Sequence, residues 1–166
     1  MKKLIALFML FTFAAAVSYA AQTVAATGQA HAKIVVAAAI SHDTTVLDFG
    51  TLVKPTSAAT VELTAAPTPV VTDSSGLVRA AGATSADHFS LTNLENGVTY
   101  TVVIPATATI QDSASHTMTV DLTPSASSFT GTAGGTDDLY VGGTLHIGAN
   151  QDAGDYTGSY TVSLTY

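Results

Sequence analysis

Five histidines are the residues of this sequence best suited to acid–base or metal chemistry. They are His31, His42, His88, His116 and His146. Each falls in a different expected element, and none forms a His-x-His pair or has the helical spacing that would bring two imidazoles to one ion. The spacing therefore favours solvated or strand-face histidines, and we expect no zinc site.

Carboxylates occur in pairs within turn-like segments, at Asp137 with Asp138 and at Asp152 with Asp155. Carboxylate and carbonyl oxygens are calcium ligands, but this spacing does not match an EF-hand loop. Aspartates in loops more often form turns and add solubilising charge. We therefore expect no metal and no cofactor.

Catalytic arrangements are not recognisable in the sequence. Serine is plentiful, but no Gly-x-Ser-x-Gly elbow occurs, and the proximity of Asp87 to His88 or of Asp112 to His116 is no closer than chance gives. A carboxylate pair that meets only through the fold stays open. We expect no catalytic residue and a protein that is not an enzyme.

The first 20 residues have the pattern of a secretory signal peptide. Lys2 and Lys3 precede an apolar stretch over 4–17, and Ser18-Tyr19-Ala20 forms a small-x-small cleavage site. The apolar stretch is shorter than the roughly 20 residues that span a bilayer, so we expect no transmembrane anchor. Export to the periplasm, cell surface or medium follows.

The remaining chain, 21–166, carries three cations against twelve Asp and Glu, a formal charge of −9. Nucleic-acid binding rests on Lys and Arg that neutralise phosphates, and three scattered cations form no such surface. The sequence therefore excludes nucleic acid as a partner. It also contains no Cys, so stability comes from packing without disulfides.

Strict alternation of apolar and polar residues over 156–166 predicts a half-buried C-terminal strand. A second alternating stretch, 88–105, is interrupted at Glu95-Asn96-Gly97 and ends at Pro105, which predicts a β-hairpin. Further strands are expected over 34–40, 45–49, 60–64, 77–80, 117–122 and 139–147. Turn residues separate these segments, so the pattern indicates one all-β domain over 21–166, an antiparallel immunoglobulin-like sandwich.

The N-terminus of the processed chain also alternates. Small or aliphatic residues at every second position make one face of an expected strand over 22–36, and these candidate partner-binding residues are Val24, Ala26, Gly28, Ala30 and Ala32. Small side chains and Gly let a strand lie deep between two sheets. Packing within the same chain, donation to a neighbouring subunit and a disordered tail all remain open at this point.

Three segments together resemble a known family. They are "LDFGTL" at 47–52, "HFSLTNLENGVTYTVVIP" at 88–105 and "LYVGGTLHIGANQDAGDYTGSYTVSLTY" at 139–166. The chain resembles the secreted bacterial family catalogued as domain of unknown function 4402. That family looks similar to the immunoglobulin-like pilins and spore-coat-U-type proteins of chaperone-usher systems. The resemblance implies a pilin-like sandwich, although this chain lacks the Cys pair of better-known pilins.

Two hypotheses for function follow. The preferred hypothesis is an extracytoplasmic structural subunit of a surface fibre or envelope layer, whose partner is another copy of itself, bound by β-strand addition, or a periplasmic chaperone. The alternative is a monomeric secreted module that binds a glycan or another surface ligand through loops such as 125–138 or 150–154. The same strand alternation suits both.

Overall fold

The computed structural model describes residues 22–34, 36–80 and 82–166. The chain divides into two compact units, Met1–Lys33 and Ile34–Tyr166, and each is described by itself. The described residues form strands and no helix, which confirms the expected all-β class. The expected signal peptide, 1–20, lies outside the described residues.

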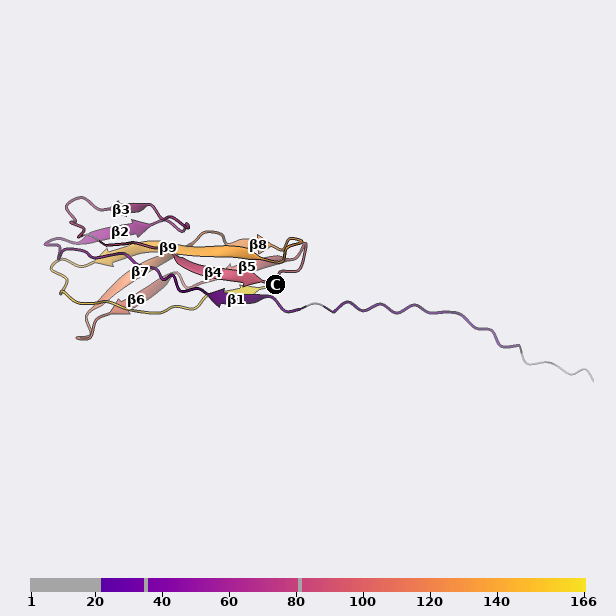
Figure 1. The fold of residues 1–166 in the computed structure, drawn as a ribbon. Helices are drawn as coiled ribbons and strands as arrows, with labels where there is room; N and C mark the ends of the chain where they lie inside the picture. The colour runs from indigo at the N-terminus through magenta and orange to yellow at the C-terminus, as the bar shows by residue number, and fades with distance from the viewer. Residues whose placement is uncertain (1–21, 35, 81) are drawn as a thin grey trace, which may run out of the picture. The chain divides into compact units, whose positions relative to one another are not determined.

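Ten strands make up the second unit, Ile34–Tyr166 (Figure 1). In chain order they are β1 Ala39–His42, β2 Ala59–Leu63, β3 Val71–Asp73, β4 Asp87–Thr92, β5 Thr99–Val103, β6 Thr107–Gln111, β7 Thr117–Pro124, β8 Ser128–Thr130, β9 Asp137–Ile147 and β10 Ser163–Thr165. All pairings between them are antiparallel.

Strand β9 is the centre of the larger sheet. Its first half pairs with β4 and its second half with β2, while β7 pairs with it over Pro124↔Val141 to Thr119↔His146. β1 extends this sheet beyond β4, β3 extends it beyond β2, and β6 extends it beyond β7. One long strand therefore holds most of the sheet together.

Gly142 lies where β9 changes partner from β4 to β2. A side chain there would meet the backbone directly: an added Cβ would overlap the carbonyl oxygen of Leu63 and lie 2.7 Å from the amide nitrogen of Ala65. Glycine is required because β2 approaches too closely for any other residue.

We expect Gly142→Ala to destabilise the domain by roughly 1–3 kcal/mol, because the sheet must shift to admit the methyl group. Gly134→Ala is the matched control, since nothing lies within 4 Å of its added Cβ. Thermal unfolding of both variants checks this, and equal melting temperatures would contradict the close approach.

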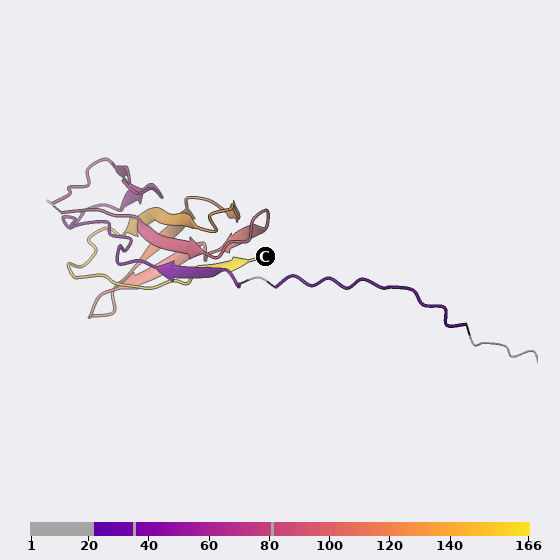
Figure 2. The ribbon, with the colours of Figure 1, turned by 45° about the vertical axis from the view of Figure 1, so that its right-hand side comes forward.

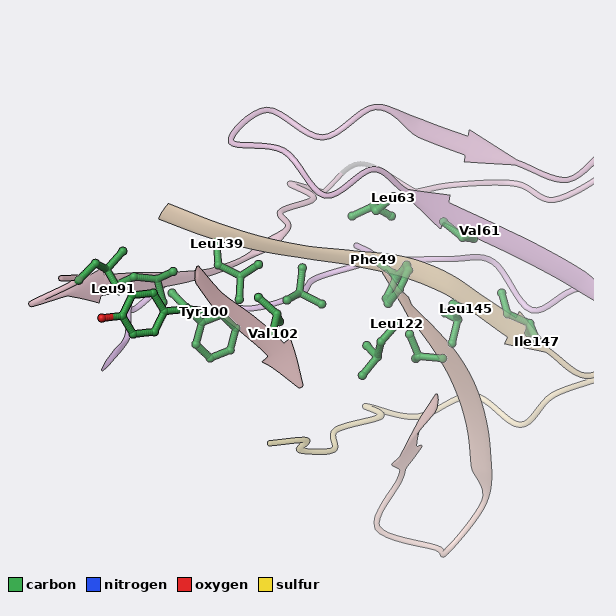
Figure 3. Close-up of a cluster of buried hydrophobic side chains, with 14 residues drawn as sticks. Phe49, Val61, Leu63, Leu91, Tyr100, Val102, Leu122, Leu139, Leu145 and Ile147 are labelled. Atoms are coloured by element: carbon green, nitrogen blue, oxygen red, sulfur yellow. The ribbon is translucent and has the colours of Figure 1, made fainter. Parts of the chain in front are cut away.

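The smaller sheet has the order β10-β5-β8 and packs against the larger one. Figure 3 shows side chains of both sheets directed into one interior, with Val102 of β5 facing Leu139 of β9. The buried face of β4 alternates, so that Phe89 and Leu91 point inward and Ser90 does not. This arrangement is the antiparallel β-sandwich predicted from the two-residue periodicity.

The hairpin predicted over 88–105 is wrong. Its strands exist as β4 and β5, but they belong to different sheets and do not pair with each other. Leu94 N–H donates to Gly135 O and Gly97 N–H to Gly131 O, so the connection is hydrogen-bonded to another loop. Gly97 has the expected positive φ of 79°. Alternation specified the buried face of each strand and not its partner.

The other predicted strands agree only in part with the strands in the structure. Those over 60–64, 117–122 and 139–147 are confirmed as β2, β7 and β9 with small shifts in bounds. Segments 45–49 and 77–80 form only isolated bridges, Asp48↔Ser85 and Leu52↔Arg79. The strand expected over 34–40 begins at Ala39 instead. Strands β3, β6 and β8 were not predicted from the sequence, and β8 lies within a stretch taken as loop.

The strand expected over 22–36 is not formed among its described residues, 22–34 and 36. These residues carry no regular secondary structure, and each of them is exposed.

Candidate functional site

The outer strands of the two sheets each have an unpaired edge, and β1 and β10 are two of them. β1 is bonded only to β4, and β10 only to β5. Asp43 N–H donates to His88 O, and antiparallel ladders alternate, so the backbone groups of Ile40 and His42 point away from β4. Val102 N–H donates to Ser127 O, and by the same logic Leu164 turns its N–H and C=O away from β5.

The chain that leads into β10 is also unpaired. A bridge joins Gln111 and Thr157 through hydrogen bonds of 2.8 and 3.0 Å. Between that bridge and β10, residues 158–162 make no backbone hydrogen bond with any part of the chain that the structure describes. The C-terminal strand expected over 156–166 is thus reduced to β10, although its alternation is correct: Tyr160, Val162 and Leu164 are half-buried.

These edges lie beside each other. β1 and the C-terminal segment are neighbours in both ribbon views (Figures 1 and 2). They run in opposite directions, because Ala38 shares a pocket with Tyr166 whereas His42 and Tyr160 reach a common carboxylate. We call the space between them the edge gap: it lies between residues 36–42 and residues 160–166.

One end of the edge gap is an apolar pocket of about 120 Å³. It is lined by Val36, Ala38, Glu95, Val98, Tyr100 and Tyr166. The rings of Tyr100 and Tyr166 lie 5.2 Å apart, with Tyr100 buried and Tyr166 76% exposed. The phenol oxygen of Tyr100 accepts the N–H of Glu95, so this side chain is held in place. The pocket is therefore preformed on one side and open on the other.

The other end of the edge gap is polar and centres on Asp87. This carboxylate is only 6% exposed. Oδ1 accepts His42 Nε2 at 2.7 Å and the backbone N–H of His88 at 2.9 Å, and Oδ2 accepts the hydroxyl of Tyr160 at 2.6 Å. We call His42, Asp87 and Tyr160 the Asp87 bridge. It ties β1, β4 and the C-terminal segment together.

Electrostatics strengthen this bridge. Burial of the Tyr160 phenol and its hydrogen bond to Asp87 raise the pKa of Tyr160 far above its usual value of 10.0. The phenol therefore stays protonated and donates across the pH range in which the protein is folded. Its ring also contacts the edge of Phe89, at 6.5 Å between centroids. Sequence reasoning does not identify Asp87 as a site residue. Its carboxylate nevertheless occupies an inward position of an alternating strand, and this pattern indicates a buried hydrogen-bond donor.

We expect Tyr160→Phe to lower the free energy of unfolding by about 1–3 kcal/mol, because it removes a donor to a buried carboxylate. Tyr166→Phe is the control, since Tyr166 is exposed and its hydroxyl has no hydrogen bond to the described chain. Urea unfolding monitored by circular dichroism gives both values. A Tyr160→Phe variant as stable as the control would show that the bridge contributes nothing.

Further histidines pair with aspartates on the surface of the domain. His88 lies between Asp43 and Asp138, at 2.7 and 2.9 Å, and His146 pairs with Asp121 at 2.8 Å. No group of three or more His, Cys, Asp or Glu in the described ranges is arranged to hold a metal ion. Asp138 contacts His88, and Asp152 contacts His116.

Asp112 and His116, for which the sequence predicts no more than a chance pairing, do meet in the structure. Oδ1 of Asp112 accepts the N–H groups of Ala114 and His116, and Oδ2 faces His116 Nδ1 at 2.9 Å. Nε2 of His116 lies 3.2 Å from Asp152. The hydrogen bond between the two side chains is the main cause that lowers the pKa of Asp112 below 3.8 and raises the pKa of His116 above 6.5. The pair organises a turn between β6 and β7.

This pair gives a pH dependence of stability. The lowered pKa of Asp112 contributes stability that is present above about pH 4 and lost in stronger acid, whereas the raised pKa of His116 contributes stability that is lost as pH rises above 6.5. We expect His116→Gln to lower the melting temperature most between about pH 4 and 6.5, and less at pH 8 to 9. His31→Gln, in the exposed N-terminal segment, is the control. A difference that is constant with pH would contradict this assignment.

The five candidate partner-binding residues, Val24, Ala26, Gly28, Ala30 and Ala32, are all exposed, and Val24 is 94% exposed. They belong to the first unit, which is described apart from the edge gap. The loops considered for a ligand are tied to neighbouring structure: 125–138 contains β8, and Asn150 donates to Pro55 O.

An antiparallel β-sandwich with two neighbouring unpaired edges is the class of protein that this geometry defines. The chain belongs to the family described as domain of unknown function 4402, whose model matches residues 39–166. The match begins at the first residue of β1 and ends at the last residue of the chain. A search of curated proteins finds no match. The described residues include no helix long and apolar enough to cross a membrane.

Proposed function

We propose that this protein is a non-enzymatic, extracytoplasmic structural subunit that assembles with copies of itself by β-strand addition. The observation that carries the proposal is the edge gap, in which two strands from two sheets lie side by side with their outer backbone groups unpaired. An added strand would pair with both edges, and such augmentation is a common mode of protein recognition. Exposed edges are otherwise a source of uncontrolled aggregation.

The proposed occupant is residues 22–32 of a second copy. This segment carries small or aliphatic residues at every second position from 24 to 32, is exposed, and forms no strand in the isolated chain. The residue that directly follows the segment adds a favourable charge. All twelve Asp and Glu lie after residue 42, so the folded unit has two cations against twelve acids, whereas residues 22–33 contain Lys33 and no acid. Opposite charge favours the encounter of segment and domain.

Export and assembly complete the proposal. The pattern over 1–20 supports secretion through a signal peptide, and a periplasmic chaperone that covers the edge gap before assembly would prevent premature pairing. The pilin-like resemblance supports a surface fibre or envelope layer as the final location.

Deletion of 21–32 is expected to leave the domain folded and secreted and to abolish high-mass assemblies, as measured by size-exclusion chromatography with light scattering. Ala30→Asp, on the small-residue face, should weaken assembly strongly, because burying an unpaired carboxylate is costly. Gln29→Asp, on the opposite face, is the matched control and should assemble normally.

Assemblies of unchanged mass after deletion of 21–32 would contradict this mechanism. A monodisperse full-length monomer whose melting temperature rises with a glycan would support the ligand-binding alternative instead.

A further inference from the structure

We propose that the edge gap has a polarity: Val24 of the added segment occupies the apolar pocket, and Ala30 lies over the Asp87 bridge. The segment then runs antiparallel to the C-terminal segment, 160–166. This inference rests on the proposed function and adds to it the direction and register of the added strand. Three observations carry it, namely the length of the gap, the pocket at one end and the bridge at the other.

The gap matches a strand of about seven residues. From Tyr160, at the Asp87 bridge, to Tyr166, at the pocket, are six residue steps, or roughly 20 Å of extended chain. From Val24 to Ala30 are also six steps. A strand with Val24 at the pocket therefore reaches the bridge at Ala30.

The pocket favours a branched aliphatic side chain. Its volume of about 120 Å³ and its lining by Val36, Val98 and the Tyr100 ring leave an apolar space that water fills poorly. Within residues 22–32 the aliphatic side chain larger than Ala is Val24. Burying it beneath the added strand removes exposed apolar surface from water on both partners.

The bridge favours a small side chain. Tyr160 donates its hydroxyl across the interior to Asp87, and His42 covers the second carboxylate oxygen. A large residue placed over these groups would displace a donor and leave a buried carboxylate short of a partner. Gly28 and Ala30 present no more than a methyl group, so they pass over the bridge without breaking it.

The reverse direction fits less well. It would place Ile34 in the pocket and Gly28 at the bridge, a span of the same length. Ile34 however belongs to the folded unit Ile34–Tyr166, only five residues before β1. In the reverse direction the donor chain leaves the gap at Ile34, five residues before its own β1. In the proposed direction it leaves at Ala30, nine residues before β1, and so has a longer connection to its own domain.

Disulfide trapping tests the direction, because the chain has no Cys of its own. Full-length Val98→Cys protein, as acceptor, is mixed under mild oxidation with Val24→Cys, Ala30→Cys or Ile34→Cys protein, as donor. We expect the Val24→Cys mixture to give at least tenfold more covalent heterodimer than either other mixture. Ala38→Cys, on the opposite side of the same pocket, is a second acceptor.

Preferential trapping of Ile34→Cys or Ala30→Cys, or equal trapping of all three, overturns the polarity while assembly by strand addition stands. Failure of the proposed function gives a different result: the 21–32 deletion still assembles, whichever donor is trapped.

Side-chain size gives a second test with its own control. Ala30→Leu should weaken the association of full-length subunits about tenfold or more, the effect of disturbing one buried hydrogen bond. Gln29→Leu, of equal size on the opposite face, should assemble as the unmodified protein does. Equal assembly of the Ala30→Leu and Gln29→Leu proteins would show that Ala30 does not lie over the bridge.

Discussion

Pairing along both edges of β9 is the constraint on which the rest of this structure depends. Its eleven residues pair with β4 and β2 in succession and with β7 over six positions. Its side chains Leu139, Val141 and Leu145 are almost fully buried. Since a central strand so fully bonded has no backbone group left to offer, the free edges belong to the outer strands of the two sheets. β1 and β10 are two such strands, and their positions bring them together.

The Asp87 bridge explains how a domain without disulfides keeps its C-terminal segment in place. Residues 158–162 have no backbone partner in the described chain, so the ladder does not hold them. The Tyr160 hydroxyl does so instead, through a carboxylate that β4 carries and that β1 also contacts through His42. A buried carboxylate is stabilising only while its donors remain, and here three donors meet it. The Asp87 bridge thus connects β1 and the C-terminal segment, between which the described chain shows no backbone hydrogen bond.

Much of this fold is present in the sequence as two-residue alternation. The buried faces of β2, β4, β7 and β9 follow from it, because Val, Leu and Phe recur at every second position. What alternation does not contain is the partner of each strand. β4 and β5 are joined by a connection that resembles a hairpin turn, yet Leu94 and Gly97 are bonded to residues 135 and 131, and the chain crosses between sheets. Sequence-local signals describe faces, whereas partners are set by distant segments.

The same distinction between local patterns and distant contacts applies to the candidate site. The small-residue face over 22–32 was found from the sequence because it is a local pattern. The edge gap was not found from the sequence. An edge is unpaired only when no other strand lies beside it, and the residues of the strand itself do not contain that information. The Asp87 bridge joins residues 45 and 73 positions apart, so no spacing rule identifies it. Only the inward position of Asp87 in β4 gave a local signal.

Backbone groups that are exposed in a free subunit are hydrogen-bonded to water, and this decides what an added strand gains. Exchanging a hydrogen bond to water for one to protein contributes only about 0.5–1.5 kcal/mol net for each bond, while ordering a residue costs a similar amount. The ladder alone therefore gives little selectivity among extended segments. Discrimination must come from side chains that enter the space between the sheets. An apolar pocket at one end and a fully bonded carboxylate at the other impose opposite demands on those side chains, which is why Val24 and Ala30 are the positions at which a correct segment differs from an incorrect one.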